Sequence, residues 1–233
     1  MNFGLAKETF AASHPDKIEQ LKFLVVGDDV SVGRTQGSIV GRRSVDFFRS
    51  LICCSNFCFR GLAGTVLVYK IAGAHAQTGA SLNEVYSVAE WVASRVGTVG
   101  VGLEHCHVPG TEPSKSHLTA TEVEVGMGIH NEPGFSRLSP IPPLKDLANQ
   151  LLTLITSTND PERSFLPFKN DGSDEVVLLV NNLGGLSELE LGGVTTAALQ
   201  ALEGKVSIKR VLSGTFMVTI SSLNATFQWI YLV

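Results

Sequence analysis

The segment DEVVLLVNNLGG, residues 174–185, constrains the fold more than any other stretch of this 233-residue chain. Its apolar run, Val176–Val180, follows two acidic residues and precedes an Asn-Asn-Leu-Gly-Gly sequence. A continuous apolar run of this length, ended by turn-forming residues, is typical of a strand that is buried in a sheet. It is the clearest strand signal in the sequence, and the segments around it decide the fold class.

Segments with strand and helix patterns alternate along the whole chain. This alternation predicts an α/β architecture whose sheets are largely parallel or mixed and are flanked by helices. The clearest helix starts are Ser81, which forms a capping-box pattern with Glu84, and Ser187. Helices are predicted at 3–21 (interrupted near Pro15), 61–80, 81–97, 142–156 and 187–202, and strands at 21–30, 98–110, 122–129, 174–185 and 206–212.

The passage from helix to strand near Gly97 predicts a boundary between two α/β subdomains. We expect residues 1–97 to be the remnant of a first, incomplete subdomain. Residues 98–233 are then expected to form the second subdomain.

The composition excludes several functional classes. Hydrophobic residues make up 44% of the chain and charged residues 17%, as in packed soluble proteins. The net charge of −4, without a basic cluster, argues against a nucleic-acid partner. Apolar stretches fall well short of the roughly 20 residues that a membrane-spanning helix needs. The N-terminus has no secretory pattern, so a cytoplasmic location is expected.

The four cysteines predict neither a disulfide framework nor a metal site. Cys53, Cys54 and Cys58 crowd one short segment, and Cys106 stands between two histidines in the sequence HCH, 105–107. No second ligand pair follows at a spacing that suits zinc. A reducing compartment fits this pattern best.

A second set of residues carries possible chemistry. VGMGIHNEPG, 125–134, places His130 between alternating glycines and a Glu-Pro-Gly turn, where the backbone can approach a small molecule closely. On the residues alone, His130 is either a buried histidine that bonds the backbone or a ligand contact. Asp28 and Asp29 either bind a metal or, as we favour, cap a turn. Asn181 and Asn182 either line a crevice or form a turn.

Five motifs in order resemble one family, the substrate-binding K domain of dihydroxyacetone (glycerone) kinases, and its fungal ATP-dependent type above all. They are GDDVSVGR, GLAGTVLVYKIAGA, EVGMGIHNEPG, VVLLVNNLGG and RVLSGTFM. In that family the histidine of the GIH-x-EPG motif forms a covalent hemiaminal with the carbonyl carbon of dihydroxyacetone. The resemblance therefore implies a catalytic His130, with Gly128 and Glu132 as further substrate-binding residues. Glu132 either orients the imidazole ring or only begins the turn.

The resemblance also implies the cofactors and partners. Dihydroxyacetone or glyceraldehyde is the expected substrate, and ATP with Mg²⁺, bound by a helical L domain, is the expected phosphoryl donor. A second copy of the chain is an open alternative to a monomer. A neutral imidazole suits the covalent step because it has a free lone pair, and its usual pKa of about 6.5 leaves it mostly uncharged at neutral pH.

Three departures from the family pattern are expected to affect activity. The sequence begins at MNFG, after the positions of the family's general-base aspartate and of its glycine-rich loop with a second histidine. Residues 44–60 separate Arg43 from GLAG, and we interpret them as an insertion, either a retained intron or a genuine loop, with an exposed apolar surface. After RVLSGTFM the expected Pro-Gly and the L domain do not follow.

These observations leave several functional hypotheses. The first is the substrate-binding part of an ATP-dependent glycerone kinase, for which we do not expect activity from this chain alone. The second is a catalytically inactive carbonyl-binding or regulatory homologue. A mispredicted gene product and a flavin mononucleotide cyclase side activity are the remaining alternatives.

Overall fold

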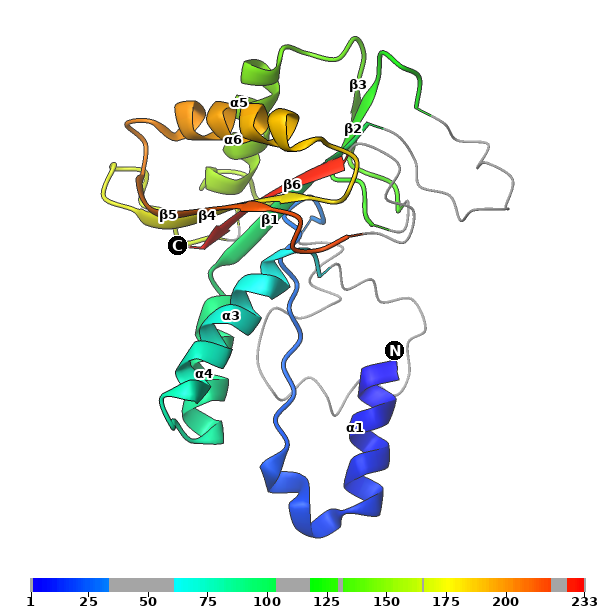
Figure 1. Cartoon of the computed structure of the whole chain (residues 1–233), viewed down its shortest axis with the longest axis vertical. Coiled ribbons are helices and arrows are strands. Elements are labelled where there is room, and N and C mark those ends of the chain that lie inside the picture. Colours follow the sequence, from blue (N-terminus) through cyan, green and yellow to red (C-terminus); the bar gives the residue numbers. More distant parts are fainter. Residues whose placement is uncertain are drawn as a thin grey trace.

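A six-stranded sheet with helices on both faces forms the centre of the molecule (Figure 1). The computed structural model describes residues 2–33, 61–103, 118–129, 132–164, 166–218 and 226–232. The strands are β1 (Val96–Gly102), β2 (Val123–Val125), β3 (Ser136–Leu138), β4 (Glu175–Asn182), β5 (Ser207–Gly214) and β6 (Thr226–Leu232). The helices are α1 (Asn2–Ser13), the 3-10 helix η1 (Pro15–Gln20), α3 (Gly64–Gln77), α4 (Leu82–Ala93), α5 (Leu144–Thr156) and α6 (Glu188–Leu202).

The sheet has the strand order β3-β2-β1-β6-β4-β5 and is mixed. In the described part of the chain β4 and β5 pair in parallel, whereas the pairs β1–β2, β2–β3, β1–β6 and β4–β6 are antiparallel. The predicted α/β class is therefore confirmed in its mixed form. The helix α6 connects the parallel pair, as a crossover between parallel strands requires.

Each face of the sheet has its own apolar core. On one face α5 and α6 bury Leu151, Leu152 and Leu202 against β1 and β4, together with Val99 and Leu178. On the other face α3 and α4 pack Leu67 and Val92 against Val96 and Leu179. In Figure 1 α5 and α6 lie above the sheet and α3 and α4 below it, while α1 stands apart from the sheet.

Both predicted helix caps are present. Ser81 and Glu84 form a complete capping box, in which the Ser81 N–H donates to Oε2 of Glu84 at 2.7 Å. Ser187 and Glu190 form a second one, with the corresponding distance at 2.8 Å. These hydrogen bonds also hold the pKa of each glutamate below its ordinary value.

The predicted strand at 21–30 is wrong. This segment forms a single parallel bridge, from Asp29 to Thr98 of β1, and has no other strand pairing among the described residues. The edge of β1 that it meets is shared with β2, which pairs at Val101 and Gly102. On this edge the 21–30 segment meets β1 at Thr98, beside the end of the strand that β2 occupies.

The subdomain boundary predicted at residue 97 falls inside β1, because this strand begins at Val96 and continues to Gly102. Helix α4 ends at Ala93, earlier than the pattern of 81–97 predicted. The division into 1–97 and 98–233 stays a prediction.

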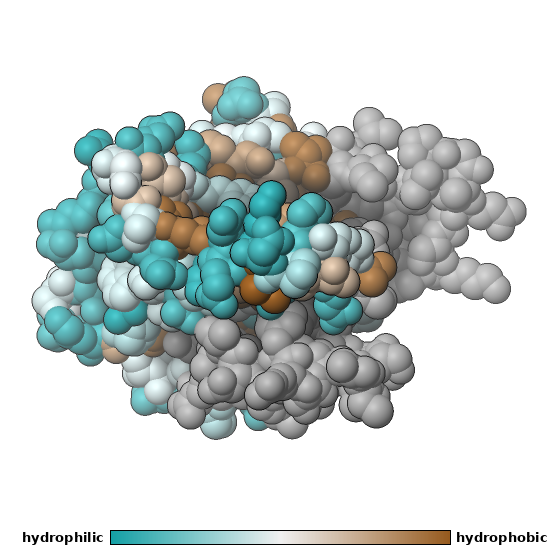
Figure 2. Space-filling model, turned by 90° about the horizontal axis from the view of Figure 1, so that it is seen from below, coloured by the Kyte–Doolittle hydropathy of each residue, from teal (hydrophilic) through white to brown (hydrophobic). Residues whose placement is uncertain are grey.

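The surface seen from below mixes hydrophilic areas with small apolar patches (Figure 2). Apolar side chains of α1, α3 and α4 are among the exposed ones, with Leu5, Tyr69 and Trp91 more than half exposed. In the described residues, no helix has the length and apolar content needed to cross a membrane.

Candidate functional site

Three glycine-containing segments meet beside β1: the 27–33 segment, the 61–64 segment and the 126–134 loop. The Thr98 N–H donates to the Asp28 carbonyl at 2.6 Å, and the Gly126 N–H donates to the Gly100 carbonyl at 2.7 Å. The Leu62 N–H donates to the carboxylate of Asp28 at 2.7 Å. Residues far apart in the sequence are thus joined around one strand of the sheet.

Asp28 holds two of these segments together from a fully buried position. Its carboxylate accepts hydrogen bonds from Leu62 N at 2.7 Å, from Gly64 N at 2.9 Å and from the hydroxyl of Thr98. Gly64 begins α3, and a Cβ there would overlap the carboxylate. Burial raises the pKa of Asp28, and these hydrogen bonds oppose that rise. Asp28 therefore caps a helix that lies 36 residues further along the chain.

Asp29 forms a tight local turn, as the capping interpretation predicted. Its Oδ1 accepts hydrogen bonds from the Ser31 N–H at 2.9 Å and from the Ser31 hydroxyl at 2.5 Å. The Ser31 Oγ also lies 3.3 Å from the carbonyl oxygen of Gly126, so the turn touches the 126–134 loop. The described residues contain no group of three or more His, Cys, Asp or Glu side chains that would hold a metal ion.

The 126–134 loop begins at a glycine that its conformation requires. Gly126 has a φ of 78°, which side chains rarely allow. A Cβ at this position would also lie 2.7 Å from Oγ of Ser31 and 3.1 Å from Cδ1 of Phe135. The backbone at Gly126 is therefore pressed between the Ser31 turn and the Phe135 ring.

Gly128 and Glu132, two of the predicted substrate-binding residues, face each other across this loop. The Gly128 N–H donates to the Glu132 carbonyl at 3.0 Å. A Cβ at Gly128 would lie 2.8 Å from Cδ of the Glu132 side chain, so the carboxylate rests against the glycine. The third residue, His130, lies between them in the sequence but outside the described residues.

The end of the loop is tied down by Glu124, a residue that the sequence patterns did not single out. Its side chain is 3% exposed. One carboxylate oxygen accepts the Gly134 N–H at 2.5 Å, and the other accepts Nε of Arg137 at 3.1 Å. Glu124 of β2 and Arg137 of β3 are direct partners in the strand register. An acidic residue inside the buried VEV strand was the available signal, because a buried charge requires partners.

Replacing Glu124 with glutamine should loosen this end of the loop. Glutamine keeps the size of the side chain but loses the charge that strengthens both hydrogen bonds. We expect the free energy of unfolding, measured by urea denaturation, to fall by about 2 kcal/mol. Glu122→Gln is the matched control, since Glu122 is better exposed and accepts a single backbone bond, from Thr119 N. An equal loss in both variants would contradict the assigned role of Glu124.

The two asparagines at the end of β4 form hydrogen bonds with the backbone. Asn181 accepts from Phe216 N and Met217 N, both at 2.9 Å, and donates to the Met217 carbonyl. Asn182 accepts from Gly184 N at 2.9 Å and from Leu186 N at 3.2 Å. The bonds of Asn182 form a local turn, as one of the two interpretations predicted, whereas those of Asn181 join β4 to the 216–217 segment. The HCH sequence at 105–107, the four cysteines and the 44–60 segment lie outside the described residues.

Comparisons with known proteins place the chain in a family. Residues 58–229 match the Dak1 domain family. The chain is 40% identical over 235 residues to a dihydroxyacetone kinase of Pichia angusta, covering 94% of this chain and 35% of that protein. It is 39% identical over 220 residues to a human triokinase/FMN cyclase, covering 93% and 33% respectively. The chain thus spans about a third of the length of these relatives.

A solved structure shows the same fold. The dihydroxyacetone kinase of C. freundii, in complex with AMP-PNP and Mg²⁺, superposes with a TM-score of 0.65 at 27% identity. The match covers all of this chain and 36% of the other. The family match covers most of the sequence and includes four of the five motifs that first indicated the resemblance. The chain belongs to the Dak1 domain family.

Proposed function

We propose that this chain is the substrate-binding K-domain part of an ATP-dependent dihydroxyacetone kinase, a phosphotransferase that acts on an alcohol group. The observation that carries the proposal is the family match together with relatives named dihydroxyacetone kinase at about 40% identity. The hydrogen bonds of Gly126, Gly128 and Gly134 support it, because a covalent substrate site needs a backbone that holds its position.

In this proposal His130 forms a covalent hemiaminal with dihydroxyacetone or glyceraldehyde. A lone pair on one imidazole nitrogen attacks the carbonyl carbon, and the C=O π electrons move to oxygen, which takes up a proton. The other ring nitrogen releases its proton, so the adduct equals protein plus one whole substrate molecule. The bond selects carbonyl compounds over glycerol and positions the terminal hydroxyl for phosphorylation.

Gly128 and Glu132 have supporting roles in the same proposal. Gly128 leaves room for the Glu132 carboxylate, which rests against it, and the Gly128 N–H donates to the Glu132 carbonyl. A carboxylate at this place is suited to accept a hydrogen bond from an imidazole ring or from a substrate hydroxyl.

The phosphoryl donor would be ATP with Mg²⁺. The part of the chain that the structure describes does not fit a metal site, since no group of three or more ligand-type side chains gathers there and Asp28 and Asp29 are engaged in capping bonds. In this proposal the ATP site belongs to the L domain of the whole protein.

The test is intact mass spectrometry after incubation of the protein with dihydroxyacetone. We expect a single adduct with the mass of one dihydroxyacetone molecule, none with glycerol, and complete loss of the adduct in His130→Ala. His75→Ala, on helix α3, is the matched control and should keep the adduct. An adduct of equal occupancy in His130→Ala would overturn the assignment.

A further inference from the structure

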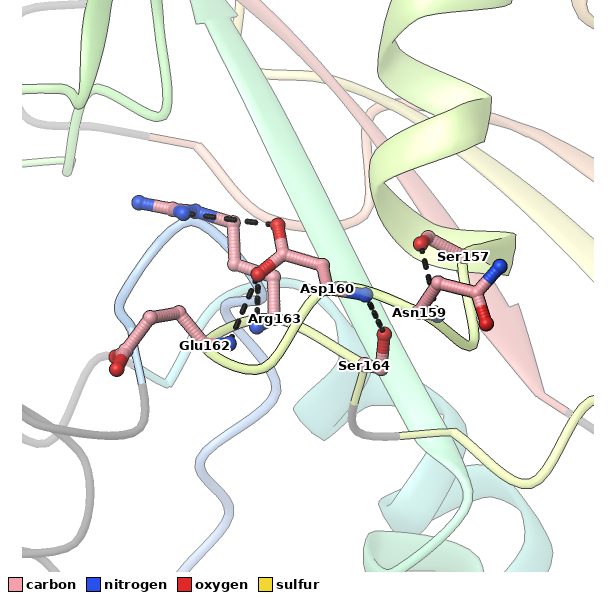
Figure 3. A network of polar contacts seen from close by, with 6 residues as sticks. All are labelled: Ser157, Asn159, Asp160, Glu162, Arg163 and Ser164. Carbon is pink, nitrogen blue, oxygen red and sulfur yellow. Dashed lines mark hydrogen bonds and ion pairs between the residues drawn. The ribbon is translucent and has the colours of Figure 1, made fainter.

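The 160–164 turn, between α5 and β4, contacts two of the segments that build the candidate site. Its polar network is drawn in Figure 3. Oε2 of Glu162 lies 2.7 Å from the position that a Cβ would take at Gly33, so Glu162 packs on the 27–33 segment. The guanidinium of Arg163 lies over the ring of Phe135, 4.7 Å from its centroid. This one short turn therefore contacts both the 27–33 segment and Phe135, the residue that follows the 126–134 loop.

Asp160 fixes the shape of this turn. Its Oδ1 accepts hydrogen bonds from Glu162 N at 2.8 Å and from Arg163 N at 3.1 Å. The Asp160 N–H donates to the Ser164 hydroxyl at 2.9 Å, and the Ser164 N–H donates to the Asp160 carbonyl at 3.0 Å. The backbone that carries Arg163 is thus held in place, and the side chain leaves it in a defined direction.

The polar contacts of Arg163 do not explain where its side chain lies. Its ion pair with Asp160 is long, at 3.7 Å between Nη1 and Oδ2. Its Nε is buried and has no hydrogen-bond acceptor within the described residues. Leaving a buried donor unpaired is unfavourable, so another contact has to compensate for it. The ring of Phe135 is that contact, because a guanidinium over an aromatic face is attracted to it.

Phe135 connects Arg163 to the 126–134 loop. Its Cδ1 lies 3.1 Å from the position of a Cβ at Gly126, so the ring packs directly on the first residue of the loop. The Phe135 N–H also donates to the Val125 carbonyl at 3.0 Å. Phe135 is 41% exposed, and the guanidinium of Arg163 covers part of its ring.

We propose that Arg163 is a positioning residue for the 126–134 loop, acting through the ring of Phe135 that it holds against Gly126. The proposal deepens the proposed function and rests on it, because this loop carries His130. Arg163 itself is assigned no contact with the substrate.

The first test is hydrogen–deuterium exchange on the full chain without substrate. We expect Arg163→Ala to speed exchange at the amides of Gly128, Gly134 and Phe135 by about fivefold, as the loss of one cation–π contact allows. Arg163→Lys should restore most of the protection, because lysine keeps a cation over the ring. In a Phe135→Leu background the alanine substitution should have no further effect on these amides.

Arg95→Ala is the matched control for the exchange experiment. Arg95 lies over the ring of Trp91 at 4.5 Å, so its removal deletes the same kind of contact at a different place. It should leave the three loop amides unchanged. Unchanged exchange at those amides in Arg163→Ala would overturn the proposal, and so would an equal increase at the amides of β4.

The second test separates this inference from the proposed function. With dihydroxyacetone as the probe, Arg163→Ala should raise the concentration needed for half-maximal adduct by about fivefold and leave the thermal midpoint within a few degrees of wild type. An unchanged requirement for dihydroxyacetone would overturn the positioning role while the proposed function stands. If wild type forms no adduct, the proposed function fails, and the exchange result still decides whether Arg163 holds the loop.

Discussion

Replacing Asp28 with alanine should lower the free energy of unfolding by about 4 kcal/mol, the largest loss that we expect from a single substitution here. The change leaves the N–H groups of Leu62 and Gly64 and the hydroxyl of Thr98 without their acceptor in a buried site. Each unpaired buried donor costs about 1–3 kcal/mol, and a total near 4 allows for some relaxation. Urea denaturation followed by circular dichroism measures the loss.

Asp171→Ala is the control for this substitution. Asp171 also accepts hydrogen bonds from a following residue, Ser173, through its N–H and hydroxyl, but it is exposed and water can replace it. We expect a loss below about 1 kcal/mol there. If Asp28→Ala and Asp171→Ala lower the free energy of unfolding equally, the burial of Asp28 does not explain its contribution to stability.

The difference in stability between wild type and Asp28→Ala should depend on pH. Burial raises the pKa of Asp28 above its ordinary value of 3.8. The folded protein therefore binds this proton at a higher pH than the unfolded chain does, and the slope of stability with pH is negative in that interval. As pH falls through the raised pKa towards 3.8, wild type should gain stability relative to Asp28→Ala. A difference between the two proteins that shrinks on acidification would contradict the direction of the shift.

Features that depend on neighbouring residues could be predicted from the sequence. The two capping boxes are complete within four residues, so Ser81 and Ser187 were recognisable without any knowledge of the fold. The strand β4 was equally clear, because its apolar run is ended by the Asn182 turn. The turn at Asp29 also closes within two residues.

Features that depend on distant partners were missed or assigned wrongly. Residues 21–30 have the apolar pattern of a strand, but in the described part of the chain they pair with β1 through a single bridge, from Asp29 to Thr98. The strand β6 pairs with both β1 and β4, yet no local signal placed it between them. Arg163 is one charged residue in the polar segment between α5 and β4. The role that we propose for it follows only from the position of Phe135 in space.

The candidate site shows the same division. The motif around His130 was recognisable in the sequence, and in the structure Gly128 and Glu132 of this motif lie against each other. Glu124 is the first residue of that motif and Phe135 directly follows the motif, but neither was predicted to hold the loop. A motif therefore indicates where a site lies, whereas the residues that hold its loop in place are recognised only from tertiary contacts.

Gly134→Ala should be the second largest change, because here an added methyl group meets backbone. Its Cβ would lie far inside van der Waals contact of the Val125 carbonyl oxygen and 2.8 Å from Cγ of Glu124. The Val125 carbonyl cannot move away freely, since it accepts the Phe135 N–H, and Glu124 is held by Arg137. Overpacking against a fixed backbone costs up to about 3 kcal/mol, which we expect as the loss in free energy of unfolding.

Gly193→Ala is the control for Gly134→Ala, since the same glycine-to-alanine change should stabilise the protein at this position. Gly193 lies inside helix α6, and nothing is within 4 Å of the position of its added Cβ. Alanine is the better helix former, so this variant should gain about 0.5–1 kcal/mol. Gly134→Ala should also reduce the dihydroxyacetone adduct, while Gly193→Ala should leave it unchanged. A stable Gly134→Ala protein with full adduct would show that the Glu124–Gly134–Val125 contacts do not set the position of the loop.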